Sequence, residues 1–205
     1  MRKRVKPRDV VKAVVFLAAL VPLSWLVWNF QQGTLSANPL SDITNETGVW
    51  TLRFIVLTIA VTPFRRITGI HEAARYRRMF GLYAFFYGSL HLMTYLWFDK
   101  FFDLNDIVLD IPKRPFITVG FTAFTLMIPL ALTSTKNMIR RMGGKKWNLL
   151  HRLVYITAIC AAIHYLWLVK VITPPQIIYA AIIGSLLAYR VVLSVLAARK
   201  KIPAR

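Results

Sequence analysis

Hydrophobic residues are gathered into long runs along this chain, and short polar, mostly basic segments separate the runs. A helix needs about 20 largely apolar residues to cross the hydrocarbon core of a bilayer. Six runs approach that length, and lipid offers their backbone groups no hydrogen-bond partner outside a helix. The pattern therefore predicts six membrane-spanning helices, at about Val10–Phe30, Gly48–Phe64, Phe80–Phe98, Phe116–Thr133, Leu149–Val171 and Ile177–Ala197.

The first run has two interpretations. A basic start, an apolar stretch and Leu35-Ser36-Ala37 downstream are typical of a cleaved signal peptide. The apolar part of a signal peptide is only about 7–15 residues long, however, and this run is longer. We therefore expect an uncleaved first helix. Pro22, Pro63 and Pro129 fall inside or at the ends of runs, where membrane helices tolerate kinks.

The composition supports the same class of protein. Of the 205 residues, 57% are hydrophobic, and the mean hydropathy is +0.52. A soluble chain of this length cannot enclose so much apolar volume, and disorder requires low hydrophobicity. We predict an all-α integral membrane protein, a six-helix bundle in which residues 1–205 form a single transmembrane domain. The connections are too short for an attached nucleotide-binding or flavoprotein domain, and the single cysteine, Cys160, excludes an internal disulfide.

The charges predict the orientation. The chain has 27 Lys and Arg against 8 Asp and Glu, a net charge of +19. The segment up to Lys12, the connections 65–79 and 134–148, and the C-terminal tail hold 20 of the basic residues, all on one predicted side. The positive-inside rule makes that side cytoplasmic, with both termini on it. This charge suits an anionic membrane surface and not nucleic acid. The other side holds the mildly acidic connections 31–47 and 99–115, where we expect a partner to dock.

Two histidines are predicted at one depth inside the membrane, where ionisable residues are costly and usually functional. His91 lies 13 residues after Arg78 in the third span, and His164 lies 13 residues after His151 in the fifth. Both spans run outward from the positive side, so at ~1.5 Å per residue both histidines lie roughly 20 Å from it. Two imidazoles at one depth predict bis-histidine haem ligation. The alternative is that each histidine hydrogen-bonds across helices as a packing contact.

The residues at the inner level of the same two spans indicate a cofactor site less specifically. His151 is too far from His164 to bind the same iron, so it is either a ligand of a second, inner haem or an interfacial residue. Arg78 stands at that level in the third span, and arginine suits a haem propionate or a flavin phosphate better than iron. Arg77, Arg78 and Arg152 either hold an anionic cofactor or serve only as positive-inside charges.

Two further ionisable residues have competing interpretations. Arg53, near the outer end of the second span, either pairs with a propionate of the outer haem or snorkels to the interface. His71 lies in the basic connection 65–79, and we expect it to be a solvated loop residue.

The spans favour redox chemistry that a cofactor supplies. They contain no recognisable carboxylate pair or activated nucleophile, and they lack the acidic residues that proton-coupled transport usually needs. A cofactor brings its own chemistry, and the protein positions and tunes it. The leading hypothesis is therefore a non-catalytic, electron-relaying cytochrome b subunit. The alternatives are a stand-alone ferric or superoxide-generating reductase, and a non-redox transporter or assembly protein.

Several short segments are together typical of one family and cover most of residues 38–170. They are Asn38-Pro39-Leu40, Gly48-Val49-Trp50, Leu52-Arg53-Phe54, Thr58-Ile59-Ala60-Val61-Thr62-Pro63, Arg77-Arg78-Met79-Phe80-Gly81-Leu82, Leu90-His91, Thr94-Tyr95-Leu96-Trp97, Lys113-Arg114-Pro115-Phe116-Ile117-Thr118-Val119-Gly120, Pro129-Leu130-Ala131-Leu132-Thr133-Ser134-Thr135, Leu150-His151-Arg152-Leu153-Val154-Tyr155 and His164-Tyr165-Leu166-Trp167. The chain resembles the MsrQ (YedZ) family of haem-binding membrane subunits, within the ferric-reductase-like transmembrane group.

This resemblance implies b-type haem bound by His91, His151 and His164, with a haem-binding core at about residues 48–171. It implies one haem or two, since the wider group carries two histidines on each of two helices and Arg78 stands where the fourth would be. It allows a bound flavin mononucleotide (FMN). The implied partner is the periplasmic molybdopterin subunit MsrP, which reduces methionine sulfoxide in oxidised envelope proteins. Electrons would come from quinol or a cytoplasmic flavin reductase, and the chain would be a multi-pass protein of the bacterial inner membrane.

Overall fold

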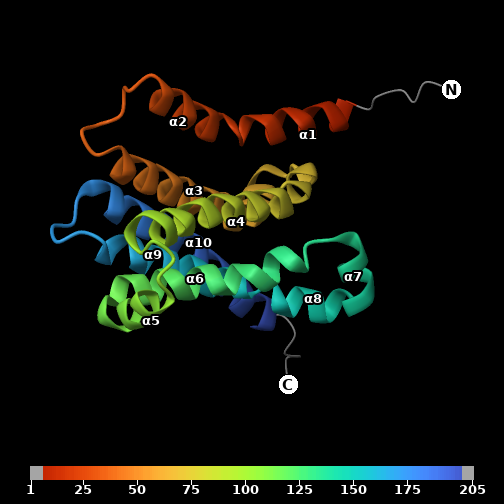
Figure 1. Cartoon of the computed structure of the whole chain (residues 1–205). Helices are drawn as coiled ribbons and strands as arrows, with labels where there is room; N and C mark the ends of the chain where they lie inside the picture. Colours follow the sequence, from red (N-terminus) through yellow and green to blue (C-terminus); the bar gives the residue numbers. More distant parts are fainter. Residues whose placement is uncertain (1–6, 200–205) are drawn as a thin grey trace.

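Helices form all the regular secondary structure in residues 7–199, which are the residues that the computed structural model describes (Figure 1). The basic residues at positions 1–6 and 200–205, which contribute to the predicted side of the termini, lie outside the described residues. In chain order the helices are α1 (Pro7–Ala18), α2 (Val21–Gln31), α3 (Pro39–Thr68), η1 (His71–Arg75), α4 (Arg77–Thr94), η2 (Tyr95–Asp99), α5 (Leu104–Lys113), α6 (Pro115–Leu132), α7 (Lys136–Met142), α8 (Gly144–Leu150), α9 (Leu153–Trp167) and α10 (Pro174–Arg199).

Five helical segments in this part of the chain are long and apolar enough to cross a membrane. They are Asp9–Gln31, Pro39–Thr68, Pro115–Leu132, Gly144–Trp167 and Pro174–Ala198. The third predicted span, Phe80–Phe98, corresponds to α4 and η2 and is not among the five. Helix α4 has 18 residues and includes Arg77, Arg78 and several small polar residues, which lower its hydropathy. It nevertheless packs along α3 and also contacts α6.

The first predicted span is two helices and not one. A turn at Ala19–Leu20 separates α1 from α2, and Pro22 lies in the first turn of α2. Proline has no backbone N–H to donate and is favoured in the first turn of a helix, where that N–H has no partner in any case, so its position agrees with a restart of the helix here.

Helix α3 begins earlier than the hydropathy predicts, at Pro39 and not near Gly48. Asn38 caps it, because its side-chain oxygen accepts a hydrogen bond from the Ser41 N–H at 3.2 Å. The helix ends at Gly69, whose φ of 73° is the left-handed conformation that glycine adopts at no steric cost. The predicted connection 31–47 is therefore a shorter loop followed by about two turns of helix, and those two turns carry part of the site.

The remaining connections are also more ordered than the sequence predicts. The connection 99–115 contains the last residue of the π-helix η2 and the whole of α5. The fifth predicted span, Leu149–Val171, is divided by a turn at His151–Arg152, which separates α8 from α9. The fourth and sixth spans agree closely with α6 and α10.

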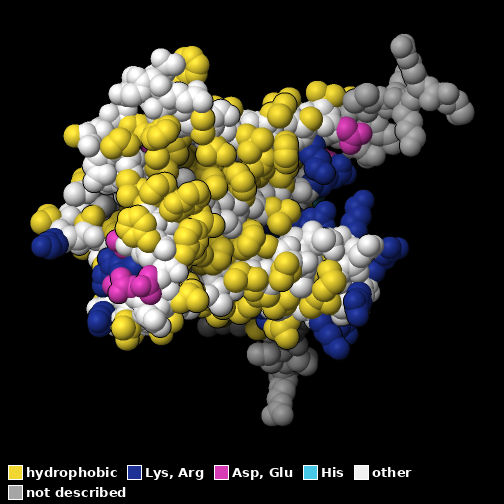
Figure 2. All heavy atoms as spheres, viewed as in Figure 1, with side chains coloured by type: hydrophobic (Ala, Val, Ile, Leu, Met, Phe, Trp, Pro, Cys, Tyr) yellow, Lys and Arg dark blue, Asp and Glu magenta, His cyan; other side chains and the backbone are white. Residues whose placement is uncertain are grey.

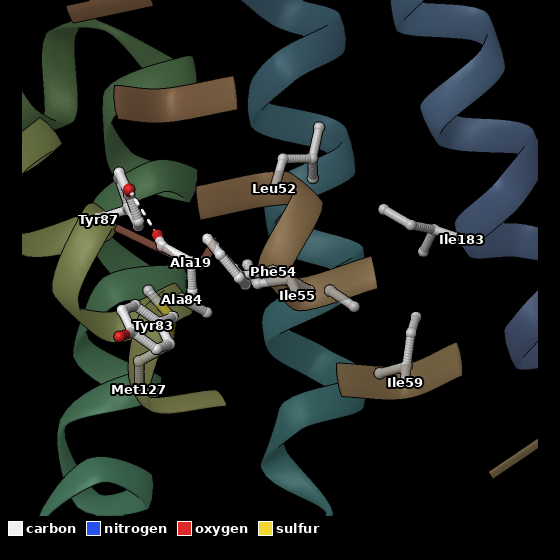
Figure 3. Packing of buried hydrophobic residues seen from close by; sticks show 11 residues of the cluster. Ala19, Leu52, Phe54, Ile55, Ile59, Tyr83, Ala84, Tyr87, Met127 and Ile183 are labelled. Atoms are coloured by element: carbon white, nitrogen blue, oxygen red, sulfur yellow. Dashed lines mark hydrogen bonds between the residues drawn. The ribbon is translucent and has the colours of Figure 1, made fainter. Parts of the chain in front are cut away.

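Helix α3 lies at the centre of the bundle, and its side chains make much of the core (Figure 3). Phe54 stacks on Tyr83 and Tyr87 of α4, with ring centroids 5.3 and 5.4 Å apart. The other buried members are Ala19, Leu52, Ile55, Ile59, Ala84, Met127, Ala158 and Ile183.

The outer surface is apolar over the middle of the bundle and charged at its two ends (Figure 2). Lys and Arg side chains gather at the end that holds η1, α7 and α8. Acidic and basic side chains mix at the opposite end, around α5. An apolar girdle between charged ends is the surface of a protein whose solvent is lipid.

Candidate functional site

Two cavities lie one above the other between the helices. The outer cavity has a volume of about 570 Å³ and is lined by residues of α3, α4, α6 and α9, with His91 and His164 among them. The inner cavity has a volume of about 670 Å³ and opens toward the basic end. Ile55 and Met127 line both cavities and so form a partition between them. Volumes of a few hundred cubic ångströms are typical of cofactor sites.

His91 and His164 meet in the outer cavity, which confirms that they share one depth. Their ring centroids are 6.0 Å apart, and the ring planes are inclined by 76°. A metal bound by one nitrogen of each ring, with bonds of about 2.0 Å, would leave the ring centres roughly 6 Å apart. The observed separation therefore fits a single metal held between the two imidazoles.

The hydrogen bonds of the two rings determine which nitrogen is free. Nδ1 of His91 lies 2.9 Å from the carbonyl oxygen of Thr44, and Nδ1 of His164 lies 2.6 Å from that of Phe116. A carbonyl oxygen can only accept, so both Nδ1 atoms carry the hydrogen. In a neutral imidazole the lone pair is then on Nε2. Metal-binding histidines commonly have their second nitrogen held in this way.

Two glycines face these rings, and the sequence analysis did not identify either as a site residue. A Cβ atom on Gly48 would lie 3.0 Å from Nδ1 of His91, and one on Gly120 would lie 2.6 Å from Nδ1 of His164. The contact at position 120 is too close for any side chain, and the contact at position 48 would require the ring to shift by a few tenths of an ångström. In the sequence, each glycine lies within a predicted span or at its end and in a segment typical of the family, and neither signal indicates a role beside a histidine.

The donor set fits haem better than a bare metal ion. Within residues 7–199, no three His, Cys, Asp or Glu side chains are close enough together to hold a metal. Two imidazoles suffice when a macrocycle supplies the other ligands. Leu52, Ala123 and Phe124 are among the apolar side chains that line the rest of the outer cavity and suit a flat, hydrophobic group.

The cation at the outer cavity is Arg114 and not Arg53. Arg53 does not line the cavity: its Nε donates to the Tyr179 hydroxyl at 3.0 Å, and its guanidinium lies 4.4 Å from the ring centre of Trp50. Neither interpretation from the sequence describes these contacts. Arg114 does line the cavity, and it pairs with Asp99 at 3.0 Å and with Asp110.

The Arg114–Asp110 pair lies outside the spans, at the C-terminal end of α5. The hydrogen bond from the Arg114 guanidinium lowers the pKa of the Asp110 carboxyl to about 2. Lys100 adds to this effect from 3.5 Å. The mouth of the outer cavity is therefore a group of charged side chains in which the Asp110 carboxylate stays ionised at ordinary pH.

His151 lies at the inner cavity, in the turn between α8 and α9. Its ring stacks on Trp147, with centroids 3.8 Å apart. Its Nε2 is 3.0 Å from the Thr133 hydroxyl, which gives its own hydrogen to the Pro129 carbonyl at 2.6 Å. That hydroxyl can then only accept from His151, so Nε2 carries a hydrogen and Nδ1 is the nitrogen left free. This is the reverse of the arrangement in the outer pair.

The structure brings the predicted inner arginines together around this cavity. Arg77, Arg78 and Arg152 all line it with His151. Arg190 of α10 lines it as well, a residue to which the sequence analysis gave no role. It donates to the Tyr155 hydroxyl and the Ile59 carbonyl, both at 2.7 Å, and its buried Nε has no partner among the described residues. Clustered guanidinium groups suit a carboxylate or phosphate ligand.

His71 lies apart from this chemistry. It is exposed at the start of η1 and lines neither cavity, as its position in a basic connection predicts.

Known proteins are similar in sequence to most of this chain. A family model described as "Ferric reductase like transmembrane component" matches residues 47–162. A "Protein-methionine-sulfoxide reductase heme-binding subunit MsrQ" of Azospira oryzae is 52% identical over 89% of this chain and 78% of its own length. Proteins of the same name from Herminiimonas arsenicoxydans and Rhodospirillum rubrum are 49% and 47% identical, over 88% and 91% of this chain and 84% and 90% of their own lengths.

Proposed function

Because the chain belongs to the MsrQ family of ferric-reductase-like, multi-pass membrane proteins, we propose that it is the haem-binding subunit of a protein-methionine-sulfoxide reductase. In this role it is not itself catalytic and relays electrons across the membrane. The observation that carries the proposal is the His91–His164 pair, 6.0 Å between ring centroids, with both Nδ1 atoms bound to carbonyls and both Nε2 atoms free.

In the outer cavity, His91 and His164 would hold one haem b through their Nε2 atoms. Haem supplies one-electron transfer when bound. The chain's own contribution is to fix both rings through the Thr44 and Phe116 carbonyls and to surround the site with apolar side chains that exclude water. Arg114, at the mouth, offers a guanidinium to a carboxylate of the bound group.

The inner cavity would take an anionic redox cofactor, either a second haem b or FMN. Arg77, Arg78 and Arg152 support this assignment, because their guanidinium groups line a single cavity. His151 would contact the bound group through Nδ1, since Nε2 is hydrogen-bonded to Thr133.

The topology we propose has six spans, in which α4, the third in chain order, is added to the five long apolar segments. Both termini lie on the cytoplasmic side of the bacterial inner membrane. The basic end around η1, α7 and α8 supports this orientation through the positive-inside rule (Figure 2). Residues 1–205 would be one transmembrane domain, with the haem-binding core at about residues 48–171.

Electrons would enter at the basic end, from quinol or a cytoplasmic flavin reductase. They would leave at the α5 end to MsrP, the periplasmic molybdopterin subunit. Support for this direction comes from the outer cavity, which lies toward the end with the mixed-charge surface made by Asp99, Lys100, Asp106, Asp110 and Arg114. Membrane lipid surrounds the bundle, and nucleic acid has no part in the proposal.

The test is the reduced-minus-oxidised visible spectrum of the purified protein, with haem quantified as the pyridine haemochrome. His91→Ala and His164→Ala should each remove the outer b-type haem, and His151→Ala should affect only the inner cofactor. His71→Ala is the matched control, because that ring is exposed and lines neither cavity. Full haem content and unchanged spectra in His91→Ala or His164→Ala would overturn the assignment.

A further inference from the structure

The two histidine sites are built in the same way on two different helix pairs. His91 of α4 bonds the carbonyl of Thr44 on α3, and four residues beyond that carbonyl stands Gly48. His164 of α9 bonds the carbonyl of Phe116 on α6, and four residues beyond stands Gly120. The separation between histidine and carbonyl is 47 residues in the first case and 48 in the second. In each case a Cβ on the glycine would meet the same ring that the carbonyl binds.

Helix geometry explains why a glycine stands at this spacing. The carbonyl of residue i points toward residue i+4, so the side chain at i+4 stands beside it. Two threonines in α3 show this directly: the Thr51 hydroxyl donates to the Thr47 carbonyl at 2.8 Å, and the Thr58 hydroxyl to the Phe54 carbonyl at 2.7 Å. A Cβ at i+4 therefore narrows the space from which an outside donor reaches the carbonyl at i, and at positions 48 and 120 it would meet the imidazole itself.

We infer that Gly48 and Gly120 are positioning residues of the histidine pair: by lacking a Cβ, each opens one helical carbonyl to an imidazole of the neighbouring helix. The opened carbonyl holds the hydrogen on Nδ1 and leaves Nε2 free. The inference rests on the proposed function, in which both Nε2 atoms bind one haem.

The two glycines should differ in how strictly they are required. A Cβ at position 120 would lie 2.6 Å from Nδ1 and 2.8 Å from Cε1 of His164, so the ring must leave its place. A Cβ at position 48 would lie 3.0 Å from the nearest ring atoms of His91, so a displacement of a few tenths of an ångström relieves it. Alanine should therefore be more disruptive at 120 than at 48.

The chain supplies a matched control for alanine in a membrane helix. A Cβ on Gly184 of α10 would meet no atom within 4 Å, and Gly184 lines neither cavity. Gly48→Ala, Gly120→Ala and Gly184→Ala should be purified with their haem and compared by haem retention, midpoint potential and low-spin electron paramagnetic resonance. The potential and the resonance report on the imidazoles and do not change through loss of stability alone.

We expect Gly120→Ala to weaken haem retention about 10-fold or more, the range typical when a group that orients a metal ligand is lost. Gly48→Ala should retain haem with a shifted potential and altered resonance, and the control Gly184→Ala should match the wild type. If Gly120→Ala does not accumulate as folded protein, Gly48→Ala decides the question alone. Wild-type values in Gly48→Ala, or in a folded Gly120→Ala, would overturn this inference while the proposed function stands. A wild-type protein without haem would overturn both.

Discussion

The hydroxyl of Tyr87 stands in the place of a missing helical hydrogen bond beside Ala19. It donates to the Ala19 carbonyl at 2.9 Å and accepts from the Leu23 N–H at 3.3 Å, two groups that an unbroken helix would pair with each other (Figure 3). One turn away, the Tyr83 hydroxyl donates to the Phe16 carbonyl at 2.8 Å. Helix α4 thus supplies hydrogen-bond partners for backbone groups that the turn between α1 and α2 leaves unpaired.

Tyr87→Phe should destabilise the protein by about 1–3 kcal/mol, because it leaves a carbonyl and an N–H unpaired away from water. The measurement is thermal unfolding in detergent. Tyr189→Phe is the matched control, since the Tyr189 hydroxyl has no hydrogen bond among the described residues. Equal unfolding temperatures for the two variants would show that Tyr87 does not support the break.

Asp110 makes the outer surface sensitive to acid. Because Arg114 lowers the pKa of Asp110 to about 2, the ionised carboxylate favours the folded state. That contribution is complete above the unfolded pKa of about 3.9 and is lost as the pH falls toward 2. Asp110→Asn should therefore lower the unfolding temperature at pH 6, and its difference from the wild type should narrow between pH 4 and pH 2.

Asp106→Asn serves as the control for this comparison, because Asp106 is exposed and such ion pairs contribute little. A pH-independent difference between Asp110→Asn and the wild type would contradict the assigned role of the carboxylate.

Arg114 and Arg53 should differ in their effect on the outer haem. Arg114→Gln removes a cation that lines the cavity, so the midpoint potential should fall as positive charge near the iron is lost. Arg53→Gln removes a cation that faces Tyr179 and Trp50 outside the cavity lining, so it should leave the potential nearly unchanged. Redox titration of both variants measures the two midpoint potentials. A larger shift of the potential in Arg53→Gln than in Arg114→Gln would show that Arg53, and not Arg114, is the cation close to the haem.

Thr133 should affect cofactor binding at the inner cavity, because its hydroxyl fixes the orientation of the His151 ring. Thr133→Val removes the hydroxyl that accepts from Nε2 and lets the ring turn, so cofactor retention at the inner cavity should fall several-fold while the outer haem remains. Thr125→Val is the control, because Thr125 bonds only the Phe121 carbonyl of its own helix and is exposed. Separate quantification of the two cofactors tests this, and retention equal to that of Thr125→Val would contradict it.

The depth of the two membrane histidines could be predicted from the sequence, but the direction in which side chains point could not. Rise per residue is nearly constant along a helix, so counting from Arg78 and His151 places His91 and His164 at one level. The direction of a side chain depends also on how its helix is rotated about its axis. Packing against neighbouring helices sets that rotation, and the pattern of apolar residues does not reveal it. That is why Arg53, at a suitable depth, is bound to Tyr179, and why Arg114 takes the place at the cavity.

Hydropathy also missed the beginning of α3. Most of residues 39–47 are polar, so they do not extend the apolar run, although Asn38 and Pro39 form a recognisable helix start. Thr44 lies in this turn, and its carbonyl is half of the His91 site. The roles of Gly48 and Gly120 could not be predicted for a related reason. The absence of a side chain matters only because a histidine ring of another helix packs there, and the sequence does not show that contact.

The partition between the two cavities separates the movement of two kinds of charge. A proton moves along hydrogen-bonding groups or water, and the side chains of Ile55 and Met127 provide neither. An electron requires only that donor and acceptor lie close together, and it can tunnel through a thin apolar layer. A bundle that encloses cofactors on both sides of these two residues would therefore conduct electrons across the membrane without letting protons leak through it.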